Sequence, residues 1–188
     1  MKNRKVVAAL QDKKTDRLVL TALMAGLVTA ATMMIKIPVP MTEGYVHLGD
    51  SMIFLAVLIL GKKNGALAAG IGSALGDLLS GYMHWVPWTL GIKFFMAFLM
   101  GAFLEHRAQT GQSHRSGISG VEIAGMAVAG CEMVAGYYVA ASVIYGSWQT
   151  PLLSVPWNIG QFVVGIVVAV ALSKALYRTP AKKFFRIS

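Results

Sequence analysis

Six long apolar runs separated by short polar turns make up most of this chain. Prolines, glycines and charged residues interrupt the runs, and these residue types are typical of helix boundaries. A helix needs about 20 mainly apolar residues to cross the hydrocarbon core of a membrane, and most of the runs approach that length. We therefore expect helices at about 17–36, 48–60, 65–81, 85–103, 121–145 and 157–177.

The second run, 48–60, is shorter than a spanning helix normally is. Taken alone, it is consistent with a span, a re-entrant segment or a helix sheltered by its neighbours. Extension backwards through Val46 is a further option. The run that precedes it is expected to end at Pro38 and Pro40, with a polar loop leading to His47.

The composition identifies the class of protein. Of the 188 residues, 56% are hydrophobic and only 13% are charged, whereas a soluble domain has about 25% charged residues. A soluble fold of this length would lack the polar residues needed to cover its surface. We predict an all-α integral membrane protein.

The basic residues indicate how the chain crosses the membrane. Six of the 17 lysines and arginines lie in the first 17 positions, and five lie at or after Lys174. Others lie after the second run (Lys62, Lys63) and after the fourth (Arg107, Arg115). The positive-inside rule then predicts six transmembrane helices with both termini cytoplasmic. The predicted parts are a basic segment at 1–16, a membrane domain at 17–178 and a basic tail at 179–188. These charges flank apolar runs, so we assign them to anionic lipid and not to nucleic acid.

Small residues form regular stripes on two of the expected helices. Ala22, Gly26 and Ala30 recur every four residues on the first, which creates a smooth face that another helix can approach closely. Two interpretations are open: packing within this protein, or docking onto a separate membrane subunit. A longer row at positions 68, 72, 76 and 80 predicts a tight interhelical face on the third helix.

The three connections on the predicted outer side carry aromatic and polar residues in place of basic ones. An interfacial aromatic belt explains single Trp and Tyr residues, but not the His, Asp, Asn and Gln that accompany them. Rings for stacking and polar groups for hydrogen bonding predict a pocket for a flat, polar solute. The candidates are Glu43, Tyr45, His47 and Asp50 in the first region, His84, Trp85 and Trp88 in the second, and Asn158 and Gln161 in the third.

Ionisable residues within the apolar runs are expected to face the protein interior and to pair, because an isolated charge at membrane depth is costly. Lys93 and Glu132 both lie near the middle of their helices. Either they form an ion pair with each other, or one of them contacts the ligand directly. Asp77 lies near the outer end of its helix, where it either orients His84 or binds the solute.

Several chemistries are not indicated. The chain lacks the Gly-Lys-Ser/Thr ending of a phosphate-binding loop, so we do not expect it to hydrolyse ATP by that route. The single cysteine, Cys131, cannot form an intramolecular disulfide. The predicted topology separates the four histidines, which excludes a metal site shared by all of them. We predict no catalytic residues, metal or cofactor.

Three stretches resemble the substrate-binding S components of energy-coupling factor (ECF) vitamin transporters. They are residues 45–50 with the apolar run that follows, the small-residue segment 65–82 that contains Asp77, and residues 85–93, which begin with Trp-Val-Pro-Trp and end at Lys93. The similarity is greatest to the riboflavin-like group that includes hydroxymethylpyrimidine and pyridoxine carriers. It extends over the first four helices, and over the last two mainly through topology.

The resemblance implies a six-helix binding subunit with a vitamin site near the outer face, capped by the loop after the first helix. It implies partners, namely a transmembrane coupling subunit of the EcfT type and two ABC ATPases that hydrolyse ATP. The family's Ala-x-x-x-Ala docking motif corresponds here to Ala22, Gly26 and Ala30, with glycine in the middle. The implied location is a bacterial plasma membrane. The best-fitting ligand is hydroxymethylpyrimidine or a pyridoxine-like ring, with riboflavin, pantothenate and a queuosine precursor also open.

Two other function classes remain open from the residues alone. One is a stand-alone carrier of a small solute. The other is a small membrane enzyme that uses Asp77, Lys93 and Glu132.

Overall fold

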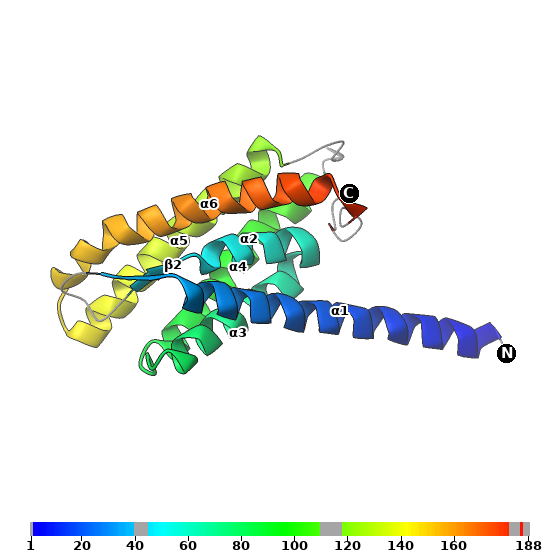
Figure 1. Cartoon of the computed structure of the whole chain (residues 1–188), viewed down its shortest axis with the longest axis horizontal. Helices are drawn as coiled ribbons and strands as arrows, with labels where there is room; N and C mark the ends of the chain where they lie inside the picture. Colours follow the sequence, from blue (N-terminus) through cyan, green and yellow to red (C-terminus); the bar gives the residue numbers. More distant parts are fainter. Residues whose placement is uncertain (1, 40–44, 110–117, 181–184, 186–188) are drawn as a thin grey trace.

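A computed structural model describes residues 2–39, 45–109, 118–180 and 185, with side chains from residue 14 onward. The described residues form a bundle of six α-helices with a short hairpin at one end (Figure 1). The elements are α1 (Lys2–Met34), β1 (Lys36–Pro38), β2 (Tyr45–His47), α2 (Gly49–Leu60), α3 (Lys62–Leu79), α4 (Val86–Gln109), α5 (Gly120–Tyr145), the 3-10 helix η1 (Thr150–Ser154) and α6 (Val155–Tyr177).

Helix α1 is longer than the sequence suggests. It runs without a break from Lys2 to Met34, so the boundary predicted at 16/17 is not an end of secondary structure. Its first half extends beyond the other helices (Figure 1). The part from Lys14 to Met34 is long and apolar enough to cross a membrane.

The predicted helical class is confirmed, and the structure adds one feature that was not predicted: β1 and β2 form an antiparallel hairpin between α1 and α2. Lys36 pairs with His47, and Pro38 pairs with Tyr45. Pro38 lies on a two-stranded ribbon, where a missing N–H donor is tolerated. The hairpin brings residues of the first outer connection over the end of the bundle.

Helix α2 lies in the centre of the bundle, sheltered by its neighbours. Ten of its 12 residues are buried, and it packs against α1, α3, α4 and α6. At 1.5 Å per residue it is only about 18 Å long, which is shorter than the membrane core. Gly61 then reverses the chain into α3 with a φ of 76°, a left-handed conformation that favours glycine.

The predicted small-residue face of α3 is confirmed, and α1 is its partner. A β-carbon at Gly72 would lie 2.9 Å from Cβ of Val28, and one at Gly76 would lie 2.8 Å from a methyl group of Thr32. The hydroxyl of Thr29 also donates to the carbonyl of Gly72, at 2.8 Å. Because any side chain at these two glycines would collide with α1, the row allows close backbone contact.

The stripe of small residues on α1 lies on the side of that helix that faces away from α3. Ala22, Gly26 and Ala30 are all exposed, and a β-carbon at Gly26 would meet nothing within 4 Å. The interpretation that this stripe packs inside the protein is therefore wrong. The face of α1 that packs inward carries Met24, Val28 and Thr32 instead.

Four helical segments among the described residues are long and apolar enough to span a membrane, and the chain is a helical membrane protein. They correspond to the first, fourth, fifth and sixth expected helices: Lys14–Met34, Val86–Gln109, Gly120–Tyr145 and Thr150–Tyr177. Helix α2 is too short for this criterion, and α3 is not apolar enough because Lys62, Lys63 and Asp77 lie within its 18 residues. The structure itself therefore supports four of the six predicted crossings.

Candidate ligand pocket

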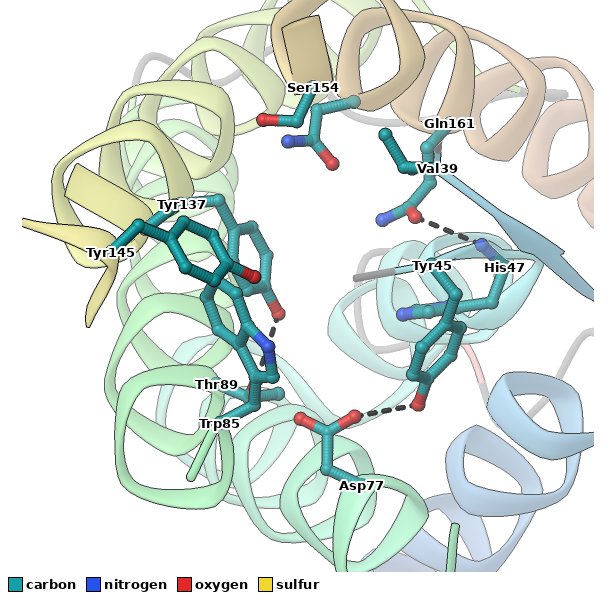
Figure 2. Close-up of a pocket in the computed structure, with 12 residues that line it drawn as sticks. Val39, Tyr45, His47, Asp77, Trp85, Thr89, Tyr137, Tyr145, Ser154 and Gln161 are labelled. Carbon is teal, nitrogen blue, oxygen red and sulfur yellow. Dashed lines mark hydrogen bonds between the residues drawn. The ribbon is translucent and has the colours of Figure 1, made fainter. Parts of the chain in front are cut away.

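A pocket lies at the end of the bundle where the hairpin sits, away from the start of α1 and the end of α6 (Figures 1 and 2). The space between its walls, including the opening to solvent, is about 550 Å³. The lining residues are Val39, Tyr45, His47, Asp77, Trp85, Thr89, Tyr137, Ala141, Tyr145, Ser154, Asn158 and Gln161.

Helical spacing explains why these residues meet. Residues four apart lie on one face of a helix, and the α5 wall consists of Tyr137, Ala141 and Tyr145. The α4 wall is Trp85, just before the helix, and Thr89. Figure 2 shows these side chains pointing into one space from different helices.

Aromatic rings form much of the wall. Trp85 lies 5.8 Å from Tyr137 and 6.4 Å from Tyr145, measured between ring centroids. Across the pocket, Tyr45 packs against Tyr82 at 4.7 Å. Rings on more than one side provide apolar, polarisable surfaces suited to stacking with a flat ligand.

Asp77 is the carboxylate that lines the pocket. The hydroxyl of Tyr45 donates to Asp77 Oδ1 at 2.6 Å (Figure 2). Burial, reinforced by the negative charge of Asp77, raises the pKa of Tyr45 well above its usual value, so the hydroxyl stays protonated and acts as a donor. Across the pocket from Tyr45, the hydroxyl of Tyr137 donates to Thr89 at 3.1 Å.

A buried polar network lies behind the pocket wall. Lys93 Nζ is 2.5 Å from Asp50 Oδ1, and both side chains are fully buried. The other oxygen, Asp50 Oδ2, accepts a hydrogen bond from Gln161 Nε2 at 2.9 Å. The backbone N–H of His47 donates to Gln161 Oε1 at 3.0 Å (Figure 2). The network thus joins α4, α2, α6 and the hairpin.

His47 is held as a neutral imidazole. Its Nδ1 accepts a hydrogen bond from the backbone N–H of Gly49 at 3.0 Å. Burial, together with the positive charge of Lys93, lowers the pKa of His47 to about 3. A neutral imidazole that accepts at Nδ1 carries its proton on Nε2.

The structure brings five of the predicted site residues to the pocket lining. They are Tyr45, His47, Trp85, Asn158 and Gln161. Asp50 and Lys93 do not reach it. They form the ion pair behind the wall, so the alternative of a Lys93–Glu132 pair is wrong, because Asp50 is the acid that α2 places next to the ammonium group.

Three other predicted residues lie away from the lining. Glu132 is half-buried on α5, five residues before Tyr137 and about 140° around the helix from it. Trp88 is 36% exposed on α4, and His84 is exposed in the preceding turn, its ring 5.9 Å from that of Trp85. Their proposed contacts with ligand are therefore not supported by their placement. Glu43 lies outside the described residues.

Residues that the sequence did not single out complete the wall, notably Thr89 and Tyr137. A signal for both existed. Thr89 is four residues from Trp85, and Tyr137 is eight residues from Tyr145, so each shares a helix face with an aromatic residue of the lining. Among the described residues, no group of three His, Cys, Asp or Glu side chains could hold a metal ion.

Comparison with known proteins identifies the family. The model of the ECF-type riboflavin transporter S component matches residues 12–178. The chain belongs to this family. The family resemblance seen in the sequence is thus confirmed, and the alternative of a membrane enzyme is wrong, because S components are subunits of transporters. S components of this kind work with EcfT and ATPase subunits and bind vitamin ligands.

Two curated proteins are similar to this S component. The thiamine precursor transporter HmpT of Lactococcus lactis subsp. cremoris is 26% identical over 178 residues, which cover 94% of this chain and 97% of HmpT. An uncharacterized protein of Pyrococcus woesei is 36% identical over 119 residues, which cover 63% of this chain and 74% of the relative.

Two solved structures share the fold. The crystal structure of the S component for biotin from an ECF-type ABC transporter aligns with a TM-score of 0.69 at 18% identity, over 93% of this chain and 98% of that one. A second S component of a bacterial ECF transporter aligns with a TM-score of 0.61 at 22% identity, over 88% and 97% of the two chains. At these identities the likeness concerns the fold alone.

Proposed function

We propose that this S component binds a thiamine precursor, hydroxymethylpyrimidine, with high affinity for uptake into the cell. The similarity to HmpT over nearly the whole of both chains carries the proposal. The pocket supports it, because tyrosine and tryptophan rings surround a few hydrogen-bonding groups, which suits a flat heterocycle. Pyridoxine is the second ligand to test, since its ring has a similar size and shape.

In this proposal the chain crosses the plasma membrane of a prokaryotic cell six times, with both termini in the cytoplasm. The basic residues at both ends of the sequence favour that orientation. The pocket then opens outward, since it lies at the other end of the bundle from the start of α1 and the end of α6 (Figure 1). The short helix α2 relies on its neighbours for shelter from lipid.

The proposed partners are a transmembrane coupling subunit and two ABC ATPases, and ATP is hydrolysed by those partners. The exposed stripe of Ala22, Gly26 and Ala30 on α1 is the proposed contact for the coupling subunit. It is smooth, it faces away from the bundle, and nothing in the described chain covers Gly26. Small residues of this kind allow close helix–helix approach in lipid.

Binding is tested with the purified chain in detergent. Calorimetric titration with hydroxymethylpyrimidine, pyridoxine, riboflavin and biotin is expected to show tightest binding of hydroxymethylpyrimidine. Quenching of tryptophan fluorescence offers a second measurement, because Trp85 lines the pocket. A purified, folded chain that binds riboflavin or biotin but no pyrimidine would refute the proposed ligand.

Uptake is tested in proteoliposomes with and without the coupling subunit and ATPases. We expect ATP-dependent uptake only in the complete assembly, and loss of uptake with Gly26→Leu while ligand binding to the purified variant is retained. The control is Val167→Leu, which places the same leucine side chain at an exposed position of α6, away from the stripe. Uptake by this chain alone would favour a stand-alone carrier instead.

A further inference from the structure

The indole N–H of Trp85 is a hydrogen-bond donor without an acceptor in the described chain. Its Nε1 is buried and has no hydrogen-bond partner, although the side chain lines the pocket and is only 8% exposed. In Figure 2 this nitrogen faces the enclosed space. A buried donor without a partner is costly, so an acceptor atom on a ligand would satisfy it.

Two more donors have directions fixed by their neighbours. The tautomer of His47 leaves Nε2–H as a donor, because Gly49 occupies Nδ1. The amide of Gln161 cannot flip without losing both bonds, since its oxygen accepts from His47 and its nitrogen donates to Asp50. One N–H of that nitrogen remains for a ligand, and in Figure 2 the amide nitrogen of Gln161 lies on the side of the pocket.

Asp77 differs from these three residues because its carboxylate accepts hydrogen bonds and does not donate them. Its carboxylate lines the pocket, is 5% exposed and accepts hydrogen bonds from the hydroxyl groups of Tyr45 and Thr89. No lysine or arginine is among the described lining residues, and Lys93 is already paired with Asp50. These two hydroxyl groups leave about half of the roughly four acceptor sites of a carboxylate open, and a ligand can supply a further donor.

We infer that the pocket selects its ligand by a fixed polarity, in which the N–H groups of Trp85, His47 and Gln161 require acceptor atoms and the Asp77 carboxylate requires an amino or cationic N–H group. This inference rests on the proposed function and specifies the ligand class of the same site: a flat, neutral or cationic aminopyrimidine. Its ring nitrogens accept hydrogen bonds and its exocyclic amino group donates one.

The same polarity rejects ligands that carry a carboxylate. A carboxylate would face Asp77 without a cation in the described wall, and like charges in a buried site are strongly unfavourable. The likeness to an S component for biotin, whose ligand is a carboxylic acid, is therefore a likeness of fold and not of pocket chemistry.

A pair of ligands of equal size tests the inference. The first is 4-amino-5-hydroxymethyl-2-methylpyrimidine, and the second is its 4-oxo analogue, in which a carbonyl acceptor replaces the amino donor and a ring N–H donor replaces a ring-nitrogen acceptor. We expect the purified wild-type chain to bind the amino compound about 10- to 100-fold more tightly, because a hydrogen bond to a charged group is lost and a repulsion is added. This comparison requires no mutation, so it does not depend on a variant that folds.

Variants then assign the effect to residues. Asp77→Asn offers an amide that donates as well as accepts, so the preference for the amino compound should fall to within about threefold or reverse. Trp85→Phe removes the indole N–H and keeps an aromatic ring. It should weaken both ligands by about 2- to 10-fold and leave their ratio unchanged. Trp157→Phe, a change at a 41% exposed tryptophan outside the lining, is the control.

The outcomes separate this inference from the proposed function. Tight but equal binding of the amino and oxo compounds would overturn the polarity inference and leave the proposed ligand standing. An unchanged ratio in a folded Asp77→Asn variant would overturn the role of Asp77. Failure of the folded wild-type chain to bind the amino compound would refute the proposed function, and the inference would fall with it.

Discussion

The buried ion pair between Lys93 and Asp50 makes a quantitative prediction about stability. Both side chains have an exposed fraction of 0%, and their charged atoms are 2.5 Å apart. The variant Lys93→Met keeps much of the lysine stem and removes the charge. Asp50 is then a buried carboxylate without its ammonium partner. Among the described residues, the side-chain amide of Gln161 still donates a hydrogen bond to it.

Removal of one member of a buried pair typically costs about 3–5 kcal/mol, because the other charge is left uncompensated. The Gln161 hydrogen bond offsets part of this, so we expect a loss near the lower end of that range. For a chain of this length, 1 kcal/mol corresponds to about 2–4 °C in melting temperature on the scale of soluble proteins. At about 3 kcal/mol, the variant should therefore melt about 6–12 °C below wild type.

The double variant Lys93→Met/Asp50→Asn distinguishes a lost pair from a packing defect. Asparagine still accepts from Gln161 and carries no charge, so most of the lost stability should return. Lys62→Met is a matched control, because the Lys62–Glu105 pair is partly exposed and such pairs contribute about 0–1 kcal/mol. Thermal unfolding in detergent is the assay. A double variant that melts as low as the single variant would refute the reasoning.

Close helix contacts, the protonation of His47 and the pocket lining each lead to a further prediction. Gly72→Ala should destabilise the chain by about 1–3 kcal/mol, since its methyl would lie 2.9 Å from Val28 Cβ, whereas Gly26→Ala should be neutral or stabilising in the same melting assay. The pKa of His47 is lower in the folded chain than its ordinary 6.5, so the unfolded chain takes up that proton first and stability falls as pH drops from about 6.5 toward 3. His47→Asn should flatten this dependence between about pH 7.5 and 5, and an unchanged slope would contradict it. Asn158→Ala should weaken hydroxymethylpyrimidine binding by about 5- to 10-fold without a change in melting temperature, and unchanged affinity in calorimetry would remove Asn158 from the site.

Helix faces explain why the pocket was predicted only in part. Trp85 and Trp88 are equally aromatic and near each other in sequence, but they lie about 60° apart around a helix. Thr89 and Lys93 follow Trp85 on the inward side of α4, and Trp88 is left on the outward side. Composition alone assigned the two tryptophans the same weight, and residues three apart share a helix face by spacing, so only the packing of α4 separates them.

The partner of Lys93 required the tertiary structure. A charge at membrane depth must be paired, and that much follows from the residue and its position. Asp50 and Glu132 are both acids within or at the end of an apolar run. Both are far from Lys93 in the sequence, so the sequence does not indicate which of them pairs with it. The central position of α2 brings Asp50 to the ammonium group and leaves Glu132 on another face of α5.

By itself the sequence determined the class of protein, its helices and the region that holds the pocket. These depend on the hydropathy of whole segments and on local backbone preferences, which neighbouring residues along the chain already express. Only the tertiary structure decided which acid pairs with Lys93, that the α1 stripe faces outward, and which rings line the pocket. Those depend on how each helix is rotated and on which helix lies beside it, because a contact between distant segments exists only once they are packed together.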